Sequence, residues 1–117
     1  MTKKSEYNKL IRDRIPEIIE SEGKSHEIVM LSVQSFRCEL KKKLVEEANE
    51  AMNSSTKEDL LNELADVFEV SEALMKEYEI TDEELIARKR EKLRKNGGFE
   101  KRLFLVSVTG NEDSVHE

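Results

Sequence analysis

The sequence predicts a mainly α-helical protein, and three observations indicate that fold class. Charged residues make up 39% of the 117 residues, whereas aromatic residues make up only 5%. Four Gly and one Pro leave few positions at which a helix must break. Apolar residues recur at three- and four-residue spacing through the middle of the chain. We therefore expect a bundle of about four helices.

The first predicted helix lies in the stretch DRIPEIIESEG, at residues 13–23. Pro16 suits an early helical position, because its missing N–H would have no partner there. The isoleucines form an apolar face, and Gly23 ends the helix. The next stretch, HEIVMLSV, is apolar and β-branched, which is typical of a short strand at residues 26–33.

The second and third predicted helices form the centre of the chain. Their apolar spacing places one from about Ser35 to Met52 and the other from about Lys57 to Tyr78. The stretch NSSTKED separates them, and Ser55 or Thr56 is a candidate N-cap for the later helix. Because the connection is short, we expect the two helices to be antiparallel neighbours.

The fourth predicted helix has clear start and stop signals. Thr81 is an N-cap residue, and Glu84 three positions later completes a capping box. Gly97 supplies a left-handed residue after the last turn. The stretch FEKRLFLVSV at residues 99–108 predicts a second short strand, which could pair with the segment at residues 26–33, because a lone strand has no ladder.

Length and composition predict one domain over residues 1–108 and a flexible C-terminal tail over residues 109–117. Cys38 is the only cysteine, so the chain cannot form an internal disulfide, which fits a reducing compartment. No run of apolar residues approaches membrane-spanning length, and none follows the N-terminal MTKK. We expect a cytoplasmic protein that has no membrane partner.

Two groups of carboxylates stand in the central helices. Glu46, Glu47 and Glu50 lie in EEANE, and Glu63 and Asp66 lie in ELAD. In so charged a chain, acids on a helix usually form a solvated face. Glu47, however, falls within an apolar stripe, and the ELAD acids alternate with valines and a leucine. An unpaired carboxylate in such a place is costly, so these groups should bind a cation or pair with Lys or Arg.

Antiparallel packing would let the two groups of acids face each other. The candidate metal ligands are then Glu47, Glu50, Glu63 and Asp66, with Glu46 at the rim. All-oxygen ligands suit Mg²⁺, with Mn²⁺ as a substitute. Zinc fits poorly, since the only soft or imidazole candidates are Cys38, His26 and His116. The residues alone leave both interpretations open, a metal site and a set of salt bridges.

A basic segment at residues 88–102 holds eight Lys or Arg and only two Glu. Such a run is usually a solvated helix end, where cations are favourable. Lys89 is different because its stem falls on the apolar face, and Lys92 follows one turn later, so either ammonium could reach a phosphate. The scarcity of aromatic residues for base stacking argues against nucleic-acid binding.

The pair of motifs EEANE and ELAD, separated by twelve residues, resembles a known signature. It is similar to the Glu-Glu-x-x-Glu and Glu-x-x-Asp motifs of the MazG-like nucleotide pyrophosphohydrolases, in the all-α NTP pyrophosphatase superfamily. YNKLIRDRIPEIIE near the start and RKREKLRKNGGFEKRLFL near the end resemble a small single-domain, house-cleaning branch related to phosphoribosyl-ATP pyrophosphohydrolase. The resemblance extends over nearly the whole chain and implies a MazG-like helical bundle with a homo-oligomeric core.

The resemblance also implies an activity and a set of site residues. The activity is Mg²⁺-dependent hydrolysis of a nucleoside triphosphate between its α- and β-phosphates, which gives a nucleoside monophosphate and pyrophosphate. The implied metal ligands are the same four carboxylates, and Glu46 either joins them or orients the attacking water, so Glu46 and Glu47 are the catalytic candidates. Lys9 and Arg12 would lie near the substrate. Asn96 stands where the family often has a basic residue, with Arg94 close by.

Two alternatives remain beside this function. Within the same chemistry, the substrate could be phosphoribosyl-ATP. In a different class, the chain could be a non-catalytic helical dimerisation module whose acids serve only as salt-bridge partners. The second alternative predicts that Mg²⁺ does not stabilise the fold, whereas a metal-binding enzyme should be stabilised by its ion.

Overall fold

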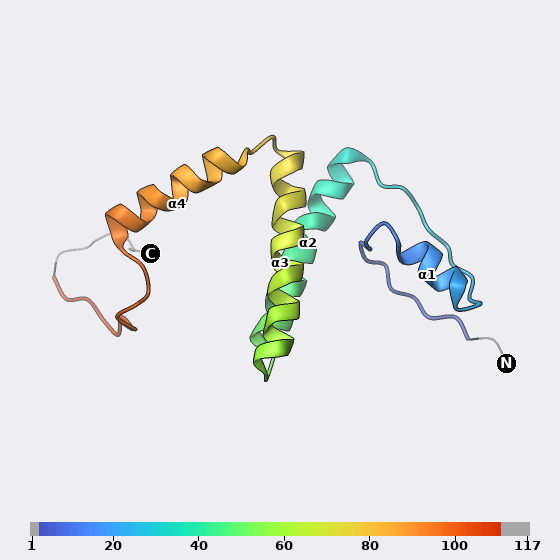
Figure 1. Cartoon of the computed structure of the whole chain (residues 1–117), viewed down its shortest axis with the longest axis horizontal. Helices are drawn as coiled ribbons and strands as arrows, with labels where there is room; N and C mark the ends of the chain where they lie inside the picture. The colour runs from blue at the N-terminus through green and yellow to red at the C-terminus, as the bar shows by residue number, and fades with distance from the viewer. Residues whose placement is uncertain (1–2, 111–117) are drawn as a thin grey trace. The chain divides into compact units, whose positions relative to one another are not determined.

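The computed structural model describes residues 3–110, and helices are the only regular elements in that part of the chain (Figure 1). The predicted mainly α fold class is thus confirmed. The helices in chain order are α1 (Ile15–Ser21), α2 (Val33–Met52), α3 (Lys57–Glu77) and α4 (Asp82–Asn96). The chain divides into two compact units, Met1–Glu79 and Ile80–Glu117.

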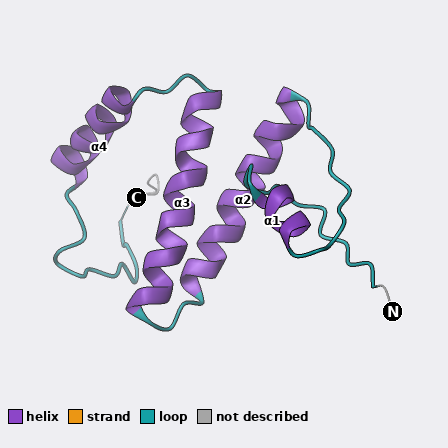
Figure 2. Cartoon of the chain, turned by 45° about the vertical axis from the view of Figure 1, so that its right-hand side comes forward, coloured by secondary structure: helices purple, strands orange, loops and turns teal. Residues whose placement is uncertain are grey.

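In the first unit, α2 and α3 form an antiparallel hairpin and lie side by side in both views (Figure 1, Figure 2). The predicted antiparallel pairing of the two long helices is therefore confirmed. Thr56 is the N-cap of α3, and its hydroxyl accepts a hydrogen bond of 3.1 Å from the backbone N–H of Asp59. This cap satisfies one of the free amides at the start of the helix and so fixes where the return helix begins.

The start of α2 differs from the prediction. Ser32 is the N-cap, and its hydroxyl accepts a hydrogen bond of 3.2 Å from the backbone N–H of Ser35, so the helix begins at Val33 instead of near Ser35. The end of HEIVMLSV is thus helical. β-Branched residues favour strands only weakly, and here a Ser cap outweighs that preference.

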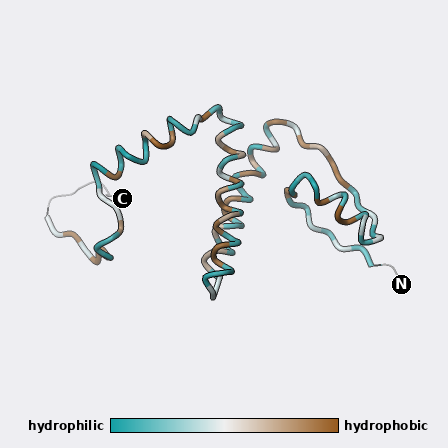
Figure 3. Tube along the Cα trace, in the orientation of Figure 1, coloured by the Kyte–Doolittle hydropathy of each residue, from teal (hydrophilic) through white to brown (hydrophobic). Residues whose placement is uncertain are grey.

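The hairpin buries few apolar side chains. Among residues 3–110, the buried hydrophobic residues are Leu40 of α2 and Val70 of α3, which are 3% and 8% exposed. Leu61 and Phe68 of α3 are more than half exposed. Hydropathy mapped on the chain shows apolar positions both along the hairpin and in the segment that precedes α2 (Figure 3). The contacts that the chain makes with itself therefore leave much apolar surface uncovered.

The predicted pair of short strands does not form in the described residues. Residues 24–32 contain no strand, and residues 103–109 contain none either. Apolar side chains in both segments, such as Met30 and Phe104, are highly exposed. A strand is stable only within a ladder, and neither segment forms one in the described residues.

The second unit contains α4, which begins and ends where the sequence predicts. The Thr81 hydroxyl accepts from the Glu84 backbone N–H, and the Glu84 carboxylate accepts from the Thr81 backbone N–H, each at 3.1 Å. The helix ends at Asn96, and Gly97 takes a φ of 81°, which is cheap only for glycine. All side chains of α4 are exposed within its unit.

Residues 97–110 follow α4 without regular structure, and residues 111–117 of the predicted tail lie outside the described residues. Over the described range, no helix has both the length and the apolar character that crossing a bilayer requires.

Candidate metal centre

Three carboxylates meet on the hairpin. Glu47 of α2 and Glu63 and Asp66 of α3 each offer an oxygen atom, and these oxygens lie within 4.8 Å of one another. Glu63 and Asp66 are separated by nearly one turn and so project from one side of α3. The antiparallel return of the chain brings Glu47 opposite them. We call these three residues the acid cluster.

The burial of the cluster sets its electrostatics. Glu47 is only 8% exposed, while the two acids of α3 are half-buried. Partial burial raises the pKa of the Glu63 carboxyl, and a hydrogen bond with Glu47 and the negative charges of Glu47, Asp66 and Glu50 raise it further. Each cause disfavours the ionised form. The cluster therefore holds more negative charge than its surroundings neutralise.

The donor set fits a hard divalent cation. All three ligands are carboxylate oxygens, which suit Mg²⁺ and Mn²⁺. Oxygens on opposite sides of one Mg²⁺ are about 4.2 Å apart, because each Mg–O bond is about 2.1 Å long. The three carboxylate oxygens all lie within 4.8 Å of one another, so side-chain rotation can bring them onto one ion.

The other two motif acids lie at the edge of the cluster. Glu50 is exposed and is not one of the three residues whose oxygens meet, although its charge acts on Glu63. Glu46 faces lysines: its Oε1 is 3.3 Å from the Nζ of Lys43 and 3.9 Å from the Nζ of Lys9. Glu46 thus has two cationic partners, whereas Glu63 of the acid cluster forms no ion pair within the described residues.

Lys43 is a neighbour of the cluster that the sequence interpretation did not include in the site. Its Nζ lies 3.3 Å from Glu46 Oε1 and 3.4 Å from Glu47 Oε1, and its side chain is 18% exposed. The sequence does contain this information, because Lys43 stands three positions before Glu46 and four before Glu47. Residues at these spacings share one helix face. Lys43 offsets part of the buried charge of Glu47.

Two residues from the N-terminal segment also reach the acids. The Nη2 of Arg12 donates a hydrogen bond of 2.6 Å to Oδ1 of Asp66. The Nζ of Lys9 lies 3.9 Å from Oε1 of Glu46. Both were candidate substrate-binding residues. The structure therefore brings Lys9 and Arg12 together with the motif carboxylates, although Arg12 and Asp66 are 54 positions apart in the chain.

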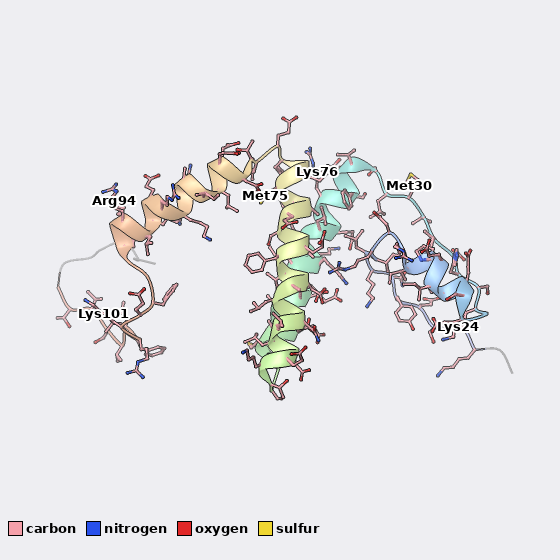
Figure 4. All side chains as sticks on the ribbon, in the orientation of Figure 1. Lys24, Met30, Met75, Lys76, Arg94 and Lys101 are labelled. Atoms are coloured by element: carbon pink, nitrogen blue, oxygen red, sulfur yellow. The ribbon has the colours of Figure 1, made fainter. Side chains whose placement is uncertain are left out.

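The remaining basic candidates belong to the second unit. Lys89, Lys92 and Arg94 are exposed on α4, and within the described residues none of them forms an ion pair. Figure 4 shows Arg94 at the end of α4 and Lys101 in the segment that follows. Lys89, Lys92 and Arg94 thus belong to the second unit, whereas the acid cluster belongs to the first.

A second polar feature of the hairpin has a different composition. The Nη2 of Arg37 donates a hydrogen bond of 2.8 Å to the backbone carbonyl of Glu77, and its guanidinium carbon lies 4.8 Å from the centre of the Tyr78 ring. The Lys41 Nζ lies 5.1 Å from the same ring. A hollow beside them is lined by Val33, Gln34, Arg37, Cys38, Lys41 and Tyr78. Its charged residues are cations, so it is not a second site for a metal ion.

Comparison of the chain with protein-family models, with curated proteins and with solved structures found no match. The chemistry of the site therefore follows from its own atoms. A half-buried group of carboxylates, with lysine and arginine at its edge, can hold a divalent cation and an anion bound to that cation.

Proposed function

We propose that the protein is a MazG-like, Mg²⁺-dependent nucleoside triphosphate pyrophosphohydrolase. It would cut between the α- and β-phosphates and release a nucleoside monophosphate and pyrophosphate, as a house-cleaning enzyme for non-canonical nucleotides in the cytoplasm. The observation that carries this proposal is the approach of Glu47, Glu63 and Asp66 to within 4.8 Å of one another. These residues come from EEANE and ELAD, the two motifs that resemble the family signature.

In this proposal the acid cluster, with Glu50 beside it, would hold the ion. The bound Mg²⁺ supplies charge neutralisation and a water of lowered pKa. Glu46 lies beside the cluster and is 39% exposed on its side chain, so it is suited to orient a water molecule and accept its proton. Hydrolysis breaks one phosphoanhydride bond, and the elements of water are divided between the two products.

The anionic substrate needs cations as well as the metal. Lys9 and Arg12 already lie at the edge of the acids, at 3.9 Å from Glu46 and 2.6 Å from Asp66. Lys89, Lys92 and Arg94 are exposed and are suited to bind a phosphate chain. Without the metal the carboxylates would repel a triphosphate, so the activity should depend strictly on a divalent cation.

We also propose that the working form is a homo-oligomer, at least a dimer. A folded chain needs a larger core than Leu40 and Val70, which are the buried apolar residues in the described range. Leu61 and Phe68 of α3 are 56% and 64% exposed, and a second copy of the hairpin would cover such a face by helix–helix packing. The test is the mass in solution by light scattering; a monomer at micromolar concentration would contradict this part of the proposal.

Pyrophosphate release tests the enzyme proposal directly. The protein is incubated with canonical and damaged nucleoside triphosphates and Mg²⁺, and we expect release with at least one of them. Asp66→Asn and Glu50→Gln should each abolish turnover while circular dichroism shows the same helix content. Glu69→Gln is the matched control, because Glu69 is an exposed acid on α3 outside the acid cluster. Release with none of the nucleotides would reject the activity, and normal turnover by Asp66→Asn would reject the site.

One observation favours the non-catalytic alternative. The acids already have salt-bridge partners, Arg12 for Asp66 at 2.6 Å and Lys43 for Glu47 at 3.4 Å. A dimerisation module could keep its carboxylates for these contacts alone. A thermal shift assay separates the two functions: Mg²⁺ should raise the melting temperature of a protein whose folded state binds the ion, and should leave that of a module without a metal site unchanged.

A further inference from the structure

The N-terminal segment is attached to the hairpin through a small number of polar contacts. Within residues 3–31, the side chains that form hydrogen bonds or ion pairs with α2 or α3 are those of Lys9 and Arg12. No backbone hydrogen bond joins this segment to the two helices. Both contacts end on carboxylates of the EEANE and ELAD motifs, Glu46 and Asp66.

These contacts have the geometry of reversible ion pairs. The hydrogen bond from Arg12 to Asp66 is short, at 2.6 Å, but the two side chains are 58% and 37% exposed. The Lys9 ammonium is 3.9 Å from Glu46, and those side chains are 45% and 39% exposed. Exposed pairs of this kind are weak and readily exchanged. Arg12 and Lys9 can thus leave the carboxylates without exposing a buried core.

The positive charges near the acids serve as counterions. Lys43 approaches Glu47, and Arg12 approaches Asp66, but no cation in the described residues forms an ion pair with Glu63. A divalent cation at the acid cluster would neutralise the charge of these carboxylates more completely than the lysine and arginine do. It would also place two positive charges next to the guanidinium of Arg12, which like-charge repulsion disfavours.

We propose that residues 7–14 act as an internal counterion for the acid cluster, and that a divalent cation bound by Glu47, Glu63 and Asp66 displaces Arg12 and Lys9 from their carboxylates. This inference rests on the proposed function in so far as the cluster binds a cation. The metal-free chain keeps the segment docked on the acids. The metal-bound chain releases it, and the freed cations of Lys9 and Arg12 become available to an anionic ligand.

The exchange is reciprocal. If the cation weakens docking of the segment by some factor, then docking weakens cation binding by the same factor. Removing the charge of Arg12 should therefore tighten metal binding. This direction is opposite to that expected if Arg12 only held Asp66 in position for the metal, because loss of such a support lowers metal affinity.

The first measurement is a calorimetric titration of the full chain with Mn²⁺ alone. We expect Arg12→Gln to bind Mn²⁺ about fivefold more tightly than the wild type, at the lower end of typical coupling between two sites. Arg14→Gln is the matched control, since Arg14 makes an equally short pair of 2.6 Å, but with Glu17 of its own segment. It should leave the affinity unchanged. Equal or weaker binding by Arg12→Gln would overturn the inference.

The second measurement follows the segment itself. Nitroxide labels on Cys38 and on Ser5→Cys, both exposed positions, report the distance between the N-terminal segment and α2 by pulsed EPR. We expect a narrow distribution without metal and a broad one with Mg²⁺. Asp66→Asn should give the broad distribution even without metal, because its side chain no longer carries the charge that attracts Arg12.

The results separate the inference from the function on which it rests. If the wild type binds Mn²⁺ but the distance distribution stays narrow and Arg12→Gln binds no more tightly, only the inference fails. If the wild type binds no Mn²⁺, both fail, since there is then no cation to displace the segment. A broad distribution in the metal-free wild type would also overturn it, because the segment would not be docked on the acids.

Discussion

The α2–α3 hairpin and α4 are both helical, but different forces define them. Helix α4 has the fuller set of local signals: a capping box at Thr81, acids in its first turn, bases in its last turn and Gly97 after its end. It nevertheless buries no side chain within its unit. The hairpin has simpler caps, yet it buries Leu40, Val70 and Glu47. Local signals decide where a helix begins and ends, whereas a partner decides whether its face is covered.

The hairpin and α4 also differ in how their charged side chains are arranged. In the hairpin, residues far apart in the sequence meet, and the acid cluster is the product of that meeting. The charges of α4 neutralise the ends of its own helix dipole and include the pair of Arg88 with Glu91 at 3.8 Å. Four pairs of variants, each a substitution with its matched comparison, test this account.

The largest expected effect is from Leu40→Ala. Leu40 is 3% exposed, so truncation removes buried apolar contacts and should lower the free energy of unfolding by about 3 kcal/mol, measured by urea denaturation. Leu93→Ala in α4 is the comparison, since Leu93 is 59% exposed, and it should cost less than about 0.5 kcal/mol. An equal cost for Leu93→Ala would show that the apolar side of α4 is covered in the assembled protein, and would remove the contrast.

The next effect is from Arg37→Gln. It removes the hydrogen bond to the Glu77 carbonyl and the contact with the Tyr78 ring, which together should contribute about 1.5 kcal/mol to the hairpin. Arg88→Gln in α4 removes only an exposed ion pair and should change stability by less than about 0.5 kcal/mol. Both are read from urea midpoints; similar values for the two variants would contradict the role of Arg37 in joining α2 to the end of α3.

A third variant, Thr81→Ala, acts on α4 alone. Loss of the N-cap hydroxyl should cost about 1 kcal/mol of helix stability. Because α4 has no buried face to hold it, the loss should appear as faster amide hydrogen exchange in its first turn. Thr81→Ser keeps a capping hydroxyl and should preserve protection. Unchanged exchange in Thr81→Ala would mean that packing, and not the cap, maintains the start of the helix.

The smallest expected effect depends on pH and concerns Glu63. The pKa of the Glu63 carboxyl is raised above its ordinary value of 4.5 in the folded chain. Protonation of Glu63 therefore stabilises the metal-free folded chain. This stabilisation is complete below pH 4.5 and is lost as the pH rises past the raised pKa. Glu63→Gln should therefore have a higher melting temperature than the wild type near pH 7 and gain nothing near pH 4. Glu69→Gln should show no such trend, and a pH-independent difference for Glu63→Gln would contradict the assignment.

Much of the helical structure follows from sequence. The predicted range Lys57–Tyr78 exceeds α3 by one residue, and the cap residues Thr81 and Gly97 bound α4 as expected. Those signals are local, so the sequence contains them. The strands at residues 26–33 and 99–108 fail for the opposite reason, because strand formation depends on a partner segment that composition alone does not supply.

The candidate site likewise has a part that the sequence predicts and a part that it does not. Interleaving of acids with apolar residues indicates that Glu47, Glu63 and Asp66 face the neighbouring helix, and their oxygens do meet. Helix periodicity also explains Lys43, which lies one turn before Glu47. The pairing of Arg12 with Asp66 could not be derived in this way, because an irregular segment has no period that tells where its side chains lie.

Cys38 has a practical consequence for counting copies of the chain. It is the only cysteine, and it is exposed on α2. A maleimide dye therefore attaches once per chain, and the number of bleaching steps from a single immobilised particle equals the number of chains in it. The stoichiometry of the assembly can thus be read one molecule at a time, without a tag and without any change to the sequence.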